Sequence, residues 1–396
     1  MRGARRAFGV VAWLAACGPG LAPQRVLPVA SLPFDAYGGA IYVPAVVNDD
    51  SALLMFDTGL SRTGFDRDWA RSIGAVSAAP GASAGIAESA STAVLRRLQL
   101  GNVELLDFPA ALYPLQGLSE ASGRVQRGLV GHDVLQHFTV EIDYRAHRVR
   151  LFDPARYRYV GPGTTVPFTP DADRPLLRAR IKARGRRPIP ARLLLDTGAS
   201  GLCLILTTPF VEQHGLGQVS PAIEAPIGTG LVGELHGSIV RLQELRLGGL
   251  SIRSPTTGLG GENKGFLGRT DIDGVIGNAV FENTRLIVDY AHRRVIIEPP
   301  ADASTPCDYD RSGLRLIARG PGLKQLMVDY VVPRSPGADA GIQVGDELLL
   351  IDGQRAAEAG LSDVRQTLRA EGALRHLVLM RDADTVRVTL QLRRLL

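Results

Sequence analysis

Two aspartates carry the most distinctive chemistry in this sequence, because each ends an apolar run and opens the same tripeptide. Asp57 follows residues 53–56 and begins Asp-Thr-Gly, and Asp196 follows residues 193–195 and begins a second Asp-Thr-Gly. If the fold brings these two carboxyl groups to about 3 Å from one another, both cannot ionise, and the pair shares one proton at working pH. In such a pair the ionised carboxylate accepts a proton from a water that attacks a carbonyl, and the protonated carboxyl group stabilises the developing charge. Which aspartate is protonated is a property of the pair and is not assigned by the sequence.

An internal repeat surrounds the two aspartates and defines the elements that must position them. Each copy consists of short apolar runs with tight turns, which predicts buried strands. A short helix is expected after Gly131 in the first copy and after Gly277 in the second. The following landmarks recur 146 positions apart: Gly131 and Gly277, Asp143 and Asp289, and Arg148 and Arg294. The repeat predicts two similar lobes, at residues 31–155 and 156–300.

Further along each copy, two hydrophobic residues precede a glycine, at residues 129–131 in the first copy and 275–277 in the second. This doubled pattern resembles the retropepsin-like (clan AA) bacterial aspartic proteases, in the arrangement where two lobes are fused in one chain. The resemblance implies an all-β, bilobal acid-protease-like fold with pseudo-two-fold symmetry, and an endopeptidase with Asp57 and Asp196 as catalytic residues. It also implies supporting residues: Thr58 and Thr197, whose hydroxyls cross-link the loops, Gly59 and Gly198, which let the backbone approach the acids, and Gly131 and Gly277, which pack beneath them.

Two glycine-rich segments, 81–92 and 226–237, fall at equivalent places in the repeat. The resemblance implies that they are hairpin flaps that close over a peptide. The flap residues expected to meet substrate are Gly85, Ile86, Ile227 and Gly228.

The sequence departs from the pepsin-like pattern three residues after each aspartate. Leu60 and Ala199 stand where a hydroxyl would bond the carboxylate. Losing a hydrogen bond to the charged form raises the pKa of the carboxyl group, so we expect a pH optimum displaced from strongly acidic toward neutral. The alternative is that both aspartates are structural turn residues, which the matched pair disfavours.

The C-terminal part has a different character. Residues 335–353 resemble a bacterial PDZ domain, a small α+β module, which we place at 313–396 after a linker at 301–312. The resemblance implies a groove that takes a peptide tail or an internal segment as an extra strand. Its carboxylate-binding loop is expected at Gly313, Leu314, Arg315 and Leu316, beside a helix near residues 364–368. The alternative for this domain is a purely structural role.

The N-terminus reads as an export signal. A basic start and a short apolar stretch end in Leu-Ala-Ala-Cys, which resembles a bacterial lipobox, so residues 1–17 are expected to be a lipoprotein signal peptide and 18–30 a linker. Lipidation of Cys17 would anchor the protein to a membrane, facing the periplasm of a Gram-negative cell envelope. The alternative is an ordinary cleaved signal peptide with an incidental cysteine.

The remaining features exclude several classes of function. Without the three N-terminal arginines, 42 basic residues face 40 acidic ones, so charge gives no sign of nucleic-acid binding. The histidines lack metal-ligand spacing, and no cofactor or metal is expected. Cys203 lies in an apolar run, and we expect it to be a small buried side chain rather than the disulfide partner of Cys307.

Two functions remain open. The favoured one is an aspartic endopeptidase whose PDZ domain recruits protein or peptide substrates, as a monomer because the two lobes complete one site. The rival is a non-catalytic, peptide-binding envelope lipoprotein.

Overall fold

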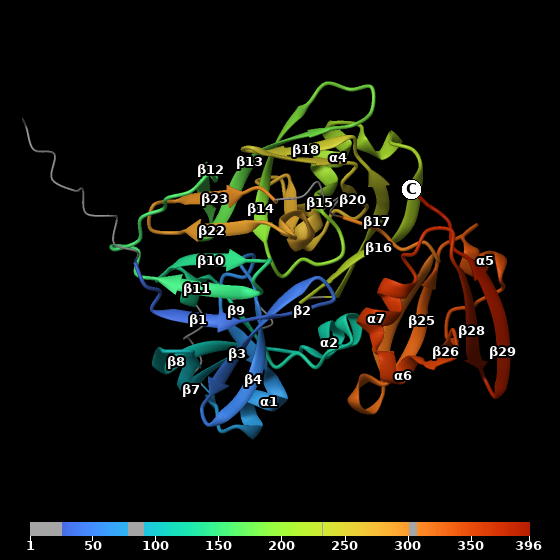
Figure 1. The fold of residues 1–396 in the computed structure, drawn as a ribbon, viewed down its shortest axis with the longest axis horizontal. Helices are drawn as coiled ribbons and strands as arrows, with labels where there is room; N and C mark the ends of the chain where they lie inside the picture. Colours follow the sequence, from blue (N-terminus) through green and yellow to red (C-terminus); the bar gives the residue numbers. More distant parts are fainter. Residues whose placement is uncertain (1–25, 78–90, 232, 301–306) are drawn as a thin grey trace, which may run out of the picture.

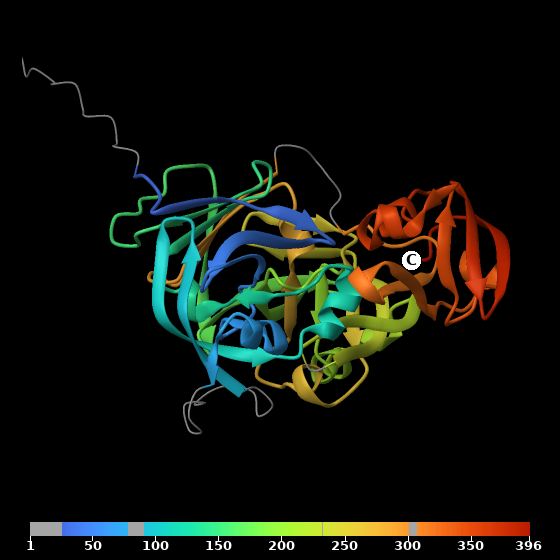
Figure 2. The same ribbon diagram turned by 90° about the horizontal axis from the view of Figure 1, so that it is seen from below.

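The computed structural model describes residues 26–77, 91–231, 233–300 and 307–396. Figure 1 shows two lobes stacked on one another and a separate C-terminal domain beside them. Seen from below in Figure 2, the C-terminal domain lies at one end of the bilobal body. The predicted signal peptide, including Cys17, lies outside the described residues.

Lobe 1 is organised by a sheet of eight strands in the order β2-β3-β4-β9-β5-β8-β7-β6. The parallel pairing of β4 with β9 aligns Met55 with Leu129 and Phe56 with Val130, so Asp57 leaves its strand next to Gly131. The elements of this lobe are β1 (Ala30–Pro33), β2 (Asp35–Tyr37), β3 (Ala40–Val47), β4 (Asp50–Phe56), β5 (Gly64–Asp66), α1 (Arg67–Ser72), β6 (Val76–Ser77), β7 (Ser91–Leu100), β8 (Val103–Tyr113), α2 (Gln116–Ser122), β9 (Gly128–Val130), α3 (His132–Leu135), β10 (Thr139–Asp143) and β11 (Arg148–Phe152).

Lobe 2 repeats the arrangement. Strand β14 pairs in parallel with β21, which sets Asp196 opposite Gly277. The elements are β12 (Thr164–Asp171), β13 (Arg174–Lys182), β14 (Ile189–Asp196), β15 (Leu204–Leu206), α4 (Thr208–Gln213), η1 (Leu216–Gln218), β16 (Ala222–Gly230), β17 (Gly233–Arg241), β18 (Glu244–Leu247), β19 (Leu250–Arg253), β20 (Thr256–Gly260), η2 (Gly265–Gly268), β21 (Gly274–Gly277), η3 (Asn278–Phe281), β22 (Arg285–Asp289) and β23 (Arg294–Glu298). The expected short helices after Gly131 and Gly277 are α3 and η3.

The lobes are joined by a continuous run of strands, β1-β11-β10-β22-β23-β12. At its centre β10 of lobe 1 pairs antiparallel with β22 of lobe 2, with Glu141 opposite Ile287. Glu141 is buried, and its carboxylate meets Arg150 of lobe 1 at 2.6 Å and Arg285 of lobe 2 at 2.5 Å. A buried carboxylate needs such partners, so this ion pair helps fix the register between the lobes.

One hydrophobic core extends through both lobes. Phe56 and Val130 beside the first aspartate, and Leu195 and Ile276 beside the second, are buried in it. Deleting large side chains from such a core costs about 2–5 kcal/mol each. The loops that carry the two aspartates therefore start from rigid, well-packed strand ends.

The C-terminal domain has its own core, which includes Leu316, Val364 and Leu379. Its main sheet runs β24-β25-β26-β28-β29, with β24 at one edge. The elements are β24 (Leu314–Arg319), η4 (Pro321–Leu323), β25 (Gln325–Val331), α5 (Pro336–Asp339), β26 (Glu347–Ile351), β27 (Gln354–Arg355), α6 (Ala356–Ala359), α7 (Leu361–Thr367), β28 (Leu374–Arg381) and β29 (Asp384–Gln391).

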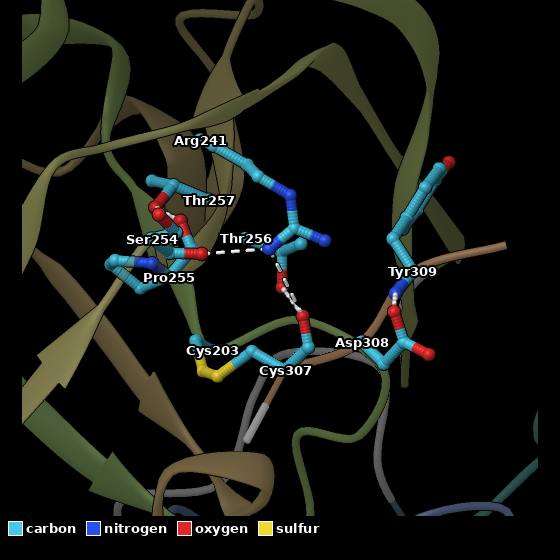
Figure 3. The surroundings of a disulfide bond; sticks show 9 residues. All are labelled: Cys203, Arg241, Ser254, Pro255, Thr256, Thr257, Cys307, Asp308 and Tyr309. Carbon is cyan, nitrogen blue, oxygen red and sulfur yellow. Dashed lines mark hydrogen bonds between the residues drawn. A yellow bond between two sulfur atoms is a disulfide. The ribbon is translucent and has the colours of Figure 1, made fainter. Parts of the chain in front are cut away.

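The expectation for Cys203 was wrong, because it forms a disulfide with Cys307 (Figure 3). Their Cα atoms are 5.6 Å apart, within the usual range for a disulfide. Both side chains are buried, and the carbonyl of Cys307 accepts hydrogen bonds from Arg241 and Thr256. The bond fastens the start of the C-terminal segment to lobe 2, directly after the Asp196 loop.

Candidate active site

The loops that carry Asp57 and Asp196 meet between the lobes. A Cβ placed on Gly59 would lie 2.3 Å from Cγ of Asp196, and one placed on Gly198 would lie 2.5 Å from Oδ2 of Asp57. Each carboxyl group is thus packed against the glycine of the opposite loop. Only glycine leaves room for this crossed arrangement, which brings the two carboxyl groups close enough for each to shift the pKa of the other.

Four buried hydrogen bonds cross-link the two loops through Thr58 and Thr197. The Thr58 hydroxyl donates to the carbonyl of Leu195 at 2.9 Å and accepts from the backbone N–H of Thr197 at 3.1 Å. The Thr197 hydroxyl donates to the carbonyl of Phe56 at 2.7 Å and accepts from the N–H of Thr58 at 3.1 Å. Each threonine therefore completes the backbone hydrogen bonding of the other lobe.

The two carboxyl groups differ in their backbone partners. Oδ1 of Asp57 accepts one N–H, from Gly59 at 2.8 Å. Oδ1 of Asp196 accepts two, from Gly198 and Ala199, both at 2.9 Å. Hydrogen bonds to the charged form favour ionisation, so the backbone stabilises an ionised Asp196 more than an ionised Asp57.

Burial is the main cause of raised pKa values in this pair. It raises the pKa of Asp57 well above the ordinary value, and the negative charge and hydrogen bond of Asp196 raise it further. Burial also raises the pKa of Asp196, but the hydrogen bond from Asp57 and the two backbone N–H groups oppose this increase. The pair can therefore hold one proton at less acidic pH than two isolated aspartates.

Arg174 contacts the Asp57 loop and was not predicted from the sequence. It begins β13 of lobe 2, and its Nη1 donates to the carbonyl of Gly59 in lobe 1 at 3.2 Å. Asp171 orients it through an ion pair of 2.7 Å. Its positive charge opposes the increase in pKa that burial causes in both aspartates. No motif marks Arg174, since its position depends on a hairpin that crosses to the other lobe.

The glycines Gly131 and Gly277 lie beneath the aspartate loops. A Cβ on Gly131 would lie 2.8 Å from the carbonyl oxygen of Leu60, and one on Gly277 would lie 2.4 Å from that of Leu202. Both backbones are extended there, so the requirement for glycine comes from this close approach. The structure thus places all eight aspartate, threonine and glycine candidates of the two loops around one centre.

Of the four predicted flap residues, two can be located. Gly228 and the buried Ile227 lie in β16, and Ile227 packs with Leu202 and Ile239 of lobe 2. Leu231, at the turn after β16, packs instead against a lobe 1 cluster of buried side chains that includes Met55 and Leu129. The β16–β17 hairpin therefore reaches from lobe 2 to lobe 1, where Met55 of this cluster lies two positions before Asp57. Gly85 and Ile86 lie outside the described residues.

The predicted peptide-binding residues of the C-terminal domain lie at the start of its edge strand. Gly313 precedes β24, and Leu314 and Leu316 point into the domain core. Arg315 points away from that core and contacts the β16–β17 hairpin. The expected groove helix is α7, which ends at Thr367.

Two features are absent from the described residues. No group of three or more histidine, cysteine, aspartate or glutamate side chains is arranged there to bind a metal ion. None of the helices in that part of the chain has the length and apolar character required to span a bilayer.

Comparisons with known proteins agree with this architecture. A family model for aspartyl proteases matches residues 43–134 and 179–295, together 209 of the 396 residues. A PDZ domain model matches residues 327–381. No curated protein matches the sequence.

Solved structures resemble the chain only distantly. An aspartic proteinase from Irpex lacteus is 13% identical with a TM-score of 0.40, and the match covers 70% of this chain and 99% of that one. A photosystem II D1 C-terminal processing protease is 24% identical with a TM-score of 0.20, and the match covers 21% of this chain and 22% of that one. Both scores are too low to carry a functional argument. The family models, together with the strand-rich lobes, confirm the predicted fold class and the C-terminal PDZ domain.

Proposed function

Because this chain belongs to the aspartyl protease family and carries a PDZ domain, we propose that it is an endopeptidase that uses Asp57 and Asp196 to activate water. The observation that carries the proposal is the crossed packing of each carboxyl group against the glycine of the opposite loop. This packing keeps two acids together in a buried site, where unpaired carboxylates are otherwise unfavourable. A protein that only bound peptides would have no need of the pair.

The unequal backbone bonding supports a division of roles. Asp196, with two N–H donors, is the ionised partner and accepts the proton of the attacking water. Asp57, with one donor and the more strongly raised pKa, carries the shared proton and donates a hydrogen bond to the carbonyl oxygen. The water oxygen bonds to the carbonyl carbon, and the C–N bond then breaks as the leaving nitrogen takes a proton.

The PDZ domain is proposed to recruit substrate. Its edge strand β24 has a groove helix, α7, beside it, which is the arrangement needed for adding a peptide as an extra strand. Residues 1–17 are proposed to export the protein and anchor it to a membrane through Cys17, as a monomer. The Cys203–Cys307 disulfide supports an oxidising compartment such as the periplasm.

The test uses soluble protein that begins after Cys17, incubated with a diverse peptide library between pH 3 and pH 8. Asp57→Asn and Asp196→Asn are measured in parallel, and a statine transition-state mimic is added to the wild type. We expect cleavage by the wild type alone, blocked by the statine. Cleavage that persists in either variant would refute the dyad mechanism, and equal inactivity of all three proteins would favour the non-catalytic peptide-binding alternative.

A further inference from the structure

The β16–β17 hairpin contacts all three parts of the molecule. Its strands belong to lobe 2, and its turn residue Leu231 packs against the same lobe 1 cluster of buried side chains as Leu60 and Leu118. Leu60 directly follows the Asp57-Thr58-Gly59 tripeptide. The hairpin therefore connects the lobes next to the proposed catalytic centre, and whatever restrains it also restrains access to that centre.

The PDZ domain restrains this hairpin through polar contacts. Nη2 of Arg315 lies 2.5 Å from Oε1 of Glu234 and donates to the hydroxyl of Thr229 at 3.2 Å. The Tyr330 hydroxyl donates to the carbonyl of Glu224 at 2.8 Å. Arg315 lies on β24 and Tyr330 on the neighbouring strand β25. Their partners lie on the hairpin, Glu224 and Thr229 on β16 and Glu234 on β17.

The ion pair between Arg315 and Glu234 is accessible to a competitor. The Glu234 side chain is 38% exposed and that of Arg315 is 19% exposed. Arg315 also lies 3.0 Å from Asp329 of its own domain. Partly exposed pairs of this kind contribute little net free energy, so another carboxylate can replace Glu234 at low cost.

Lobe 1 covers the PDZ groove in this arrangement. Helix α2 lies beside β24, where Glu120 is 3.5 Å from Arg319. At the end of α2, Leu361 of the groove helix packs so closely that a Cβ on Gly123 would lie 2.5 Å from its Cβ. Figure 1 shows α2 next to α7. A peptide that adds to β24 must therefore move the PDZ domain away from α2.

A cationic side chain of the groove helix reaches the edge strand. Nη2 of Arg365, on α7, donates to the carbonyl of Leu316 at 2.6 Å. Burial and the positive charges of Arg315 and Arg369 lower the pKa of Arg365 to about 10. The guanidinium group of Arg365 thus lies at the edge of β24, where a peptide strand would add, and its positive charge favours an acidic ligand.

We propose that the contact between Arg315 and Glu234 is a latch, and that an acidic peptide entering the PDZ groove competes with Glu234 and releases the β16–β17 hairpin. Occupancy of the PDZ domain then increases access to the active site. The increase in cleavage rests on the proposed endopeptidase function. The competition for Arg315 does not, and it is measured separately.

Competition is tested by fluorescence anisotropy in the Asp57→Asn background, where the probe is not consumed. The probe is a labelled alanine-rich decapeptide ending in Glu-Glu-Val, compared with one ending in Gln-Gln-Val. Adding Glu234→Gln removes the internal competitor and is expected to tighten binding of the acidic peptide about fivefold. Glu224→Gln is the matched control, because its side chain is exposed on the same hairpin ten positions before Glu234, and the substitution keeps the backbone carbonyl that Tyr330 binds. It is expected to change nothing.

Hydrogen exchange of residues 222–241 reports release directly, and it is expected to increase with the acidic peptide and in Arg315→Gln. In the active protein, saturating acidic peptide is expected to raise kcat/KM for a reporter substrate, and Glu234→Gln to raise it without peptide. Equal peptide affinities of Glu234→Gln and Glu224→Gln, or unchanged exchange with bound peptide, would overturn the latch. If no variant cleaves any substrate while binding and exchange respond as expected, the protease proposal fails and the latch stands.

Discussion

Replacing Thr58 with alanine tests the cross-link between the two aspartate loops. The substitution removes two buried hydrogen bonds, one to the carbonyl of Leu195 and one from the N–H of Thr197. Each backbone group left buried without a partner costs about 1–3 kcal/mol, so the free energy of unfolding is expected to fall by about 2–6 kcal/mol. Thr197→Ala should cost a similar amount, because Thr197 makes the two equivalent bonds in the other direction.

Urea denaturation of each variant measures this loss, and Thr58→Ser is the control. Serine keeps the hydroxyl and loses one methyl group, which costs about 1 kcal/mol. We also expect kcat of Thr58→Ala to fall at temperatures where the protein is fully folded, because the loops no longer fix the two carboxyl groups. Equal unfolding free energies for the alanine and serine variants would refute the reasoning, since packing rather than hydrogen bonding would then account for the loss.

Three further predictions follow from the site and the PDZ domain. Gly59→Ala places a Cβ 2.3 Å from Cγ of Asp196 and is expected to lower kcat by about 100-fold, whereas Gly117→Ala, whose Cβ meets nothing within 4 Å, should leave peptide cleavage unchanged. Because the folded state raises the pKa of Asp57, this group destabilises the folded protein progressively as pH rises. Asp57→Asn should therefore raise Tm at pH 7 and leave it unchanged near pH 3. A lower Tm at pH 7 would contradict this. Burial raises the pKa of Asp310 to about 6, so the contribution of its protonated form to folding stability is complete below about pH 4 and is lost as pH rises toward 6. The Tm of the wild type should fall over this range, and the Tm of Asp310→Asn should lack this decrease.

The two catalytic candidates could be located from the sequence, because the aspartates that carry the chemistry also mark the ends of strands in the repeated fold. Asp57 and Asp196 each end a strand that must be buried, and an internal repeat marks them a second time. The close approach that requires Gly59 and Gly198 was implied by the family resemblance, and the structure adds that each glycine faces the carboxyl group of the other lobe.

Contacts between distant segments were not predictable in the same way. Cys203 lies in an apolar run, and the pairing with Cys307, 104 positions away, depends on how the linker returns to lobe 2. Arg174 and Glu234 are single charged residues in hairpins, without a motif or a periodic pattern. Their partners, Gly59 and Arg315, lie in another lobe or domain, and a local pattern contains no information about such tertiary placement.

The disulfide also determines how far the PDZ domain can move. With Cys307 bound to lobe 2, only residues 308–313 separate the fixed point from β24, a span of about 20 Å when fully extended. Arg315 therefore remains at a high effective concentration relative to Glu234 after the latch opens. A free peptide competes with a tethered partner rather than a diffusing one, so the hairpin recloses quickly when the peptide leaves. Reduction of Cys203–Cys307 would lengthen the tether, lower this effective concentration, and make the hairpin easier to release by weak ligands.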